Sequence, residues 1–116
     1  MARRDLSGAV DFTVLDRMTG DDAVSEEVLG LFTEQAAMWS VMLDPREEGW
    51  RDGVHTIRGA AAGIGAHSLA EACADAEAAD QAVASVALDR VRNALDLALA
   101  DVAAWRHELM LRSLRG

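Results

Sequence analysis

The chain has 116 residues, of which 51% are hydrophobic, and its formal net charge is −9. This length suits one domain with one core, and the hydrophobic fraction is too high for a disordered chain. The chain has 20 acidic and 11 basic residues. This negative charge disfavours binding to a phosphate backbone or to an anionic membrane surface. We therefore expect one soluble domain over residues 1–116 that binds neither nucleic acid nor membranes.

The sequence carries few indications of its compartment. Cys73 is the only cysteine, which excludes an intrachain disulfide and is consistent with a reducing environment. Residues 1–12 contain two arginines without a following apolar run, unlike a secretory signal. No stretch approaches the roughly 18 uncharged apolar residues of a transmembrane helix. These features predict a cytoplasmic protein.

The first two elements in chain order are predicted to be helices. One proline, no tyrosine and little alternation of β-branched residues disfavour strands. Residues 10–18 are weakly amphipathic and predict a short leading helix, after which Asp21 or Asp22 can cap a helix over about residues 23–43. The apolar residues of that second helix have helical spacing. They are Val24, Val28, Leu31, Phe32, Trp39, Met42 and Leu43.

The segment "DPRE" predicts the start of the next helix. Asp44 can cap, Pro45 suits the first helical position, and Glu47 completes a pair that resembles a capping box. We expect this helix over about residues 46–64, with Gly65 ending it in a left-handed conformation. Its apolar residues recur every three or four positions. They are Trp50, Val54, Ile57, Ala61 and Ile64.

Two further helices complete the expected architecture. One is predicted over about residues 67–81, and "AVAS" should follow as a break before Ser85 caps the last helix. Leu69, Cys73, Ala76 and Asp80 lie roughly in line on the first of the two. The last helix has the narrow apolar seam of a bundle helix, formed by Leu88, Val91, Leu95, Ala98, Val102, Trp105 and Leu109. The pattern predicts an all-α fold: an antiparallel up-down four-helix bundle with a short N-terminal leading helix.

The stretch "HTIRGAAAGIGA", residues 55–66, carries the candidate functional site. At about 100° per residue, His55 lies about 140° from the apolar positions of its helix and should face solvent. Its neighbours within about 60° on the helix surface are Arg51, Arg58, Gly59, Ala62 and Ala66.

Two glycines make this histidine unusual. Gly59 and Gly63 each cost about 1 kcal/mol relative to alanine inside a helix. They stand four and eight positions after His55 and clear space beside the imidazole, which indicates that another surface approaches it. Neutral histidine is a competent nucleophile near pH 7, and the Arg58 guanidinium can form charge-assisted bonds to phosphate oxygens.

The residues from His55 to Glu77 resemble the signature of histidine-containing phosphotransfer (HPt) domains of bacterial and fungal phosphorelays. That signature has a histidine, then Lys or Arg, glycine, an aliphatic residue and Gly-Ala, found here as His55, Arg58, Gly59, Ile64, Gly65 and Ala66. Leucine, a small residue and Glu or Gln follow on the next helix, found here as Leu69, Cys73 and Glu77. The chain departs from the family at Ala60, where serine is frequent, and at Gly63, where a larger polar residue is common.

The resemblance implies a phosphoryl carrier. His55 would accept the phosphoryl group from a receiver-domain aspartate of a hybrid histidine kinase and pass it to the receiver of a response regulator. Glu77 would accept a hydrogen bond from Nδ1 of His55, which leaves Nε2 nucleophilic, and Arg58 would neutralise the phosphoryl charge. Partner access would come from Gly59, Ala62, Gly63 and Ala66.

The resemblance also implies what this chain lacks. It would bind no metal or cofactor itself, because the partner receiver domain supplies the Mg²⁺. Without an ATP-binding segment it would have no autokinase activity, and it would act as a monomer. His67 and His107 form no metal-ligand spacing with His55 or Cys73.

Two alternatives remain open. The same bundle could bind or sequester a response regulator without net transfer, or it could be a structural adaptor that is never phosphorylated.

Overall fold

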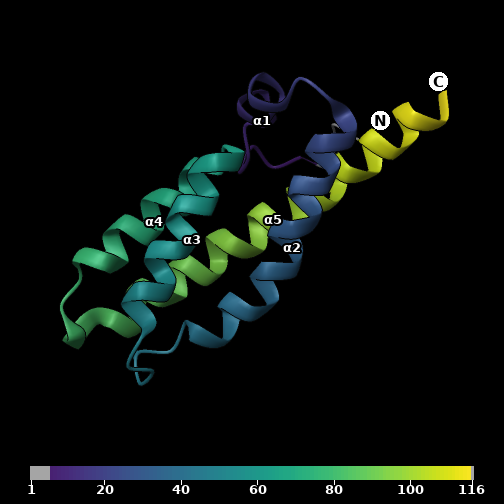
Figure 1. The fold of residues 1–116 in the computed structure, drawn as a ribbon. Coiled ribbons are helices and arrows are strands. Elements are labelled where there is room, and N and C mark those ends of the chain that lie inside the picture. Colours follow the sequence, from purple (N-terminus) through teal and green to yellow (C-terminus); the bar gives the residue numbers. More distant parts are fainter. Residues whose placement is uncertain (1–5, 116) are drawn as a thin grey trace.

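A computed structural model describes residues 6–115, in which every regular element is helical (Figure 1). The elements are α1 (Phe12–Thr19), α2 (Asp22–Met42), α3 (Trp50–Ile64), α4 (His67–Ala78), the short 3-10 helix η2 (Gln81–Val83) and α5 (Ala84–Arg115). Helices α2 to α5 run alternately up and down as a bundle, and α1 lies at the end where α3 passes into α4 (Figure 1). The predicted fold class is confirmed.

The apolar seams predicted for α3 and α5 form the centre of the core. Every residue of both seams is buried, with Val54, Ile57 and Val91 fully inaccessible. Helix α5 packs against both α2 and α4, and α4 packs along α3. Helices α3 and α5 each have a single apolar face, so the periodicity of their apolar residues identified the buried side correctly.

The seam predicted for α2 is partly wrong. Val24 is 42% exposed and Leu31 is 56% exposed, whereas Leu29 and Ala36 are buried in their place. Apolar residues occur on more than one face of α2, so periodicity alone did not single out the core face. Ser25 is also buried there, and its hydroxyl forms a 2.6 Å hydrogen bond with Oγ1 of Thr19.

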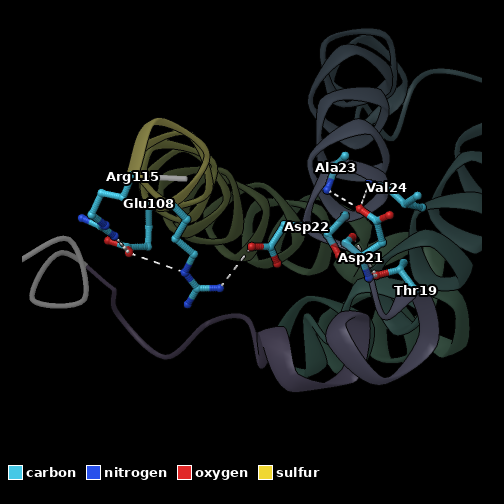
Figure 2. Close-up of polar contacts among 9 residues, drawn as sticks. Thr19, Asp21, Asp22, Ala23, Val24, Glu108 and Arg115 are labelled. Atoms are coloured by element: carbon cyan, nitrogen blue, oxygen red, sulfur yellow. Dashed lines mark hydrogen bonds and ion pairs between the residues drawn. The ribbon is translucent and has the colours of Figure 1, made fainter.

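The start of α2 follows the predicted capping chemistry, and α1, for which no cap was predicted, begins in the same way. Asp21 precedes α2, and its carboxylate accepts hydrogen bonds from the backbone N–H groups of Ala23 (2.7 Å) and Val24 (3.4 Å) (Figure 2). Asp11 caps α1 in the same way through the N–H of Thr13. A side-chain acceptor at this position satisfies N–H groups that have no partner within the helix.

The predicted start of α3 at residue 46 is wrong, because the helix begins at Trp50. Residues 44–49 form turns, in which the Asp44 carboxylate binds the backbone N–H (2.9 Å) and guanidinium (2.8 Å) of Arg46. These hydrogen bonds from Arg46 lower the pKa of Asp44 to about 2. A side chain that accepts a hydrogen bond from the backbone N–H two residues later favours a turn over the start of a helix.

The end of α4 also differs from the prediction. The helix ends at Ala78, and Ala79 and Asp80 adopt extended conformations before η2. Asp80 is therefore exposed and lies outside the seam in which the sequence placed it. The break precedes "AVAS", and α5 begins at Ala84.

The N-terminal segment is fixed to α5 by a buried carboxylate that the sequence analysis did not identify. Asp101 is fully buried and accepts hydrogen bonds from the N–H (2.8 Å) and hydroxyl (2.8 Å) of Ser7 and the N–H of Val10 (3.3 Å). Nearby, the rings of Phe12 and Trp105 stack at 5.0 Å. These contacts hold α1 at its place on the bundle.

Helix α5 extends beyond the start of α2 (Figure 1). Its 32 residues span about 48 Å, against about 32 Å for the 21 residues of α2. On this extension Arg115 pairs with Glu108 at 3.1 Å (Figure 2), and Arg112 lies 3.6 Å from both Glu108 and Asp22. Such exposed pairs contribute little to stability, typically below about 1 kcal/mol each.

Gly65 joins α1 to the end of α3. Its φ of 86° is left-handed, and its carbonyl accepts a 2.8 Å hydrogen bond from the N–H of Asp11. A Cβ at this position would lie 2.2 Å from the carbonyl oxygen of Asp11, so the close approach of the two backbones requires glycine.

Substituting Gly65→Ala should lower the free energy of unfolding by about 2–3 kcal/mol, from left-handed strain and loss of the Asp11 hydrogen bond. Urea unfolding followed by circular dichroism measures the change. Gly63→Ala is the matched control: a Cβ there meets nothing within 4 Å in the described part of the chain, so this substitution should stabilise the helix by about 1 kcal/mol. Equal effects of the two substitutions would contradict this account of Gly65.

Candidate functional site

His55 projects from the outer face of α3, as the helical periodicity predicts. Its side chain is 72% exposed, whereas Val54 and Ile57 on the inner face are fully buried. The core contacts of these neighbours fix the rotation of α3 about its axis. The imidazole is therefore presented to solvent by a rigid helix.

Glu77 of α4 meets the imidazole from the side. Its Oε2 lies 3.1 Å from Nδ1 of His55, and the carboxylate side chain is only 24% exposed. An ionised carboxylate can only accept hydrogen bonds, so this contact favours the tautomer with its proton on Nδ1. The lone pair of a neutral His55 is then on Nε2.

Arg58 binds the other oxygen of the same carboxylate. Its guanidinium donates a 3.2 Å hydrogen bond to Oε1 of Glu77, and its side chain is 47% exposed. The carboxylate thus links the imidazole to a permanent positive charge. The remaining N–H groups of Arg58 are suited to an anion that arrives at His55.

Helical periodicity predicts Arg51 on the face of His55 but indicates no role for it. In the structure its guanidinium reaches across to α4 and donates 2.8 Å hydrogen bonds to the carbonyl oxygens of Glu77 and Ala79. No sequence pattern indicates a bond from a side chain of one helix to the last carbonyls of another.

Three of the four residues predicted to give partner access lie on the outer surface. Gly59 and Ala62 are exposed, and Gly63 is half-buried. A Cβ on either glycine would meet no atom of residues 6–115 within 4 Å. Packing among the residues that the structure describes therefore does not require glycine at these two positions. Both glycines leave the surface beside His55 open.

The prediction for Ala66 is wrong, because its side chain is fully buried in the core. The helical angles used for the prediction apply only as far as Ile64, where α3 ends. The left-handed turn at Gly65 redirects the chain and points Ala66 inward. Its N–H donates a 2.8 Å hydrogen bond to the carbonyl of Ala61.

An apolar groove of about 330 Å³ adjoins the open surface. It lies between α1, α2 and α3, and Gly63 and Ala60 belong to its α3 wall. Met18 (64% exposed) and Leu31 (56% exposed) stand on the opposite walls. A larger hollow of about 780 Å³ lies between the start of α2 and the end of α5 and includes no residue of α3 or α4.

The remaining candidate nucleophile and metal ligands lie apart from this constellation. Cys73 is buried, and burial, together with the negative charge of Glu77, raises the pKa of its thiol to about 12. The thiol therefore stays protonated and unreactive at neutral pH. His67 and His107 are exposed on α4 and α5. Within residues 6–115 no three His, Cys, Asp or Glu side chains are grouped to hold a metal ion.

An all-helical bundle that presents an exposed histidine beside a carboxylate is the arrangement expected of a histidine phosphotransfer domain. The family model of the Hpt domain matches residues 27–105. The chain therefore belongs to the Hpt family, whose members carry phosphoryl groups in phosphorelays and interact with receiver domains of kinases and response regulators.

One solved structure supports the same assignment over nearly the whole chain. It is the crystal structure of the histidine phosphotransferase ShpA from Caulobacter crescentus, which is 54% identical in sequence. The match covers 92% of this chain and 99% of that one, with a TM-score of 0.81. A search among curated proteins gave no match. None of the helices in residues 6–115 has the length and hydropathy needed to cross a membrane.

Proposed function

We propose that this chain carries a phosphoryl group on Nε2 of His55 between two receiver domains. The donor is the aspartyl phosphate of a hybrid histidine kinase, and the acceptor is the aspartate of a response regulator. The observation that carries this proposal is the 3.1 Å contact between Nδ1 and Glu77 on an imidazole that is 72% exposed. It combines a defined tautomer with free access to the other ring nitrogen.

The transfer is a displacement at phosphorus. The lone pair of Nε2 attacks the phosphorus atom, and the bond to the aspartate oxygen breaks, so the aspartate leaves as a carboxylate. The proton stays on Nδ1, and the nearby negative charge of Glu77 stabilises the cationic ring that forms. Arg58 offsets charge on the phosphoryl oxygens. The receiver domain supplies the Mg²⁺, and transfer to the response regulator reverses these steps.

The receiver domain docks over His55 on the surface opened by Gly59, Ala62 and Gly63. The apolar groove continues this surface, since Gly63 lies in its wall and is one helical turn from Gly59. His55, Arg58 and Glu77 all come from one chain, so a monomer presents the full site. We also propose that the chain depends on a separate phosphoryl donor instead of autokinase activity, and that it acts in the cytoplasm.

Phosphoryl transfer to His55 is tested with a receiver domain that has been phosphorylated by acetyl phosphate in the presence of Mg²⁺. The wild-type chain should gain an acid-labile, base-stable phosphate, and His55→Gln should gain none. His67→Gln and His107→Gln are matched controls, because both residues are exposed histidines outside the site, and they should be labelled like the wild type.

A folded wild-type chain that accepts no phosphate from several such donors would overturn the carrier function. Receiver binding that persists in this case and in His55→Gln would instead support a module that sequesters its partner.

The glycine beside His55 gives a second test, because stability and function should change in opposite directions. Gly59→Ala should stabilise the helix by about 1 kcal/mol. The added methyl group obstructs the approaching receiver, so transfer should slow by about tenfold, equivalent to about 1.4 kcal/mol. Urea unfolding and single-turnover transfer measure the two effects.

Asn93→Ala serves as the control for Gly59→Ala, because it improves helix propensity at an exposed position of α5. Its transfer rate should match the wild type. A Gly59→Ala chain that is more stable and transfers at the wild-type rate would show that no partner surface needs this space.

A further inference from the structure

We propose that Arg51 is a positioning residue for the phosphoacceptor: it fixes the end of α4 and thereby holds the Glu77 carboxylate against His55. This inference rests on the proposed transfer at His55. Arg51 precedes His55 by one helical turn on the same face of α3, yet its two hydrogen bonds lead to α4.

The end of α4 needs such a partner. The last four carbonyl groups of a helix have no acceptor role within it, and basic side chains near this end satisfy them and complement the helix dipole. Helix α4 has no basic residue in its last turn. The Arg51 guanidinium supplies this charge from α3, with one nitrogen on the Glu77 carbonyl and the other on the Ala79 carbonyl, both at 2.8 Å.

Arg51 is itself held in place by the core. Its guanidinium carbon lies 4.3 Å from the ring centroid of Trp50, a side chain that is only 3% exposed. Contact with an aromatic face attracts the guanidinium and limits its motion. The arginine therefore connects a fixed point of α3 to the last turn of α4.

Glu77 transmits the effect to the phosphoacceptor. Its backbone carbonyl binds Arg51, while its carboxylate binds Nδ1 of His55 and the guanidinium of Arg58. If the last turn of α4 frays, the carboxylate loses its position, and the Nδ1-protonated tautomer of His55 loses its support. Arg51 thus acts on the imidazole through Glu77 without touching it.

A double-mutant cycle separates positioning from direct contact between Arg51 and the partner. Arg51→Ala should slow transfer from a phosphorylated receiver about five- to tenfold. In a Glu77→Ala background the same substitution should slow it by less than twofold, since the carboxylate that Arg51 positions is absent. Arg51→Lys should recover only part of the rate, because an ammonium group lacks the two-pronged geometry of guanidinium.

Nitrogen-15 NMR of the His55 ring supplies a readout that does not depend on transfer. Arg51→Ala should lower the fraction of neutral imidazole protonated on Nδ1. Gln81→Ala is the matched control: its amide binds the Pro45 carbonyl at 3.0 Å, next to the end of α4, without contacting Glu77. This variant should leave both the tautomer and the transfer rate unchanged.

Two results would overturn the proposal. One is an equal slowing by Arg51→Ala with and without Glu77, which would indicate direct partner contact. The other is an unchanged tautomer ratio in folded Arg51→Ala protein. If the wild-type chain accepts no phosphate, the proposed function fails, and the tautomer ratio still decides the role of Arg51.

Discussion

The contact between the Glu77 carboxylate and Nδ1 of His55 is the interaction on which the rest of this site depends. The two residues lie 22 positions apart and on different helices, so the contact requires α3 and α4 to pack in one register. The buried seam of α3 sets its rotation, and Gly65 sets the turn by which the chain enters α4. A carboxylate on Nδ1 leaves the lone pair of a neutral imidazole on Nε2, the nitrogen at which we propose phosphoryl transfer.

The molecule combines a rigid support with an open face. Behind His55 the helix packs through Val54 and Ile57, whereas beside it Gly59 leaves space that nothing in the described chain fills. Glycine at that position weakens the helix by about 1 kcal/mol relative to alanine. This loss of helix stability leaves room at the surface on which we propose that a receiver domain docks. Asp101 holds the segment that leads into α1, and α1 forms one wall of the groove that adjoins this surface.

Sequence periodicity predicted those parts of the structure in which one face of a helix is clearly apolar. The seams of α3 and α5 and the outward direction of His55 follow from it directly. Val24 and Leu31 were misplaced because α2 is apolar on more than one face, and Ala66 because periodicity ends where the helix ends. The nearness of Glu77 to His55 came from the family resemblance, since no local pattern brings two helices together. The contacts of Arg51 and Asp101 depend on tertiary packing, so neither was predicted.

The position of the phosphoryl group on the ring tests this account most directly. The chain labelled with nitrogen-15 would be phosphorylated by a receiver domain and examined by NMR for phosphorus–nitrogen coupling in the histidine rings. We expect coupling to Nε2 of His55, with the proton retained on Nδ1 beside Glu77. Phosphorus on Nδ1 of His55, or on His67 or His107, would contradict it.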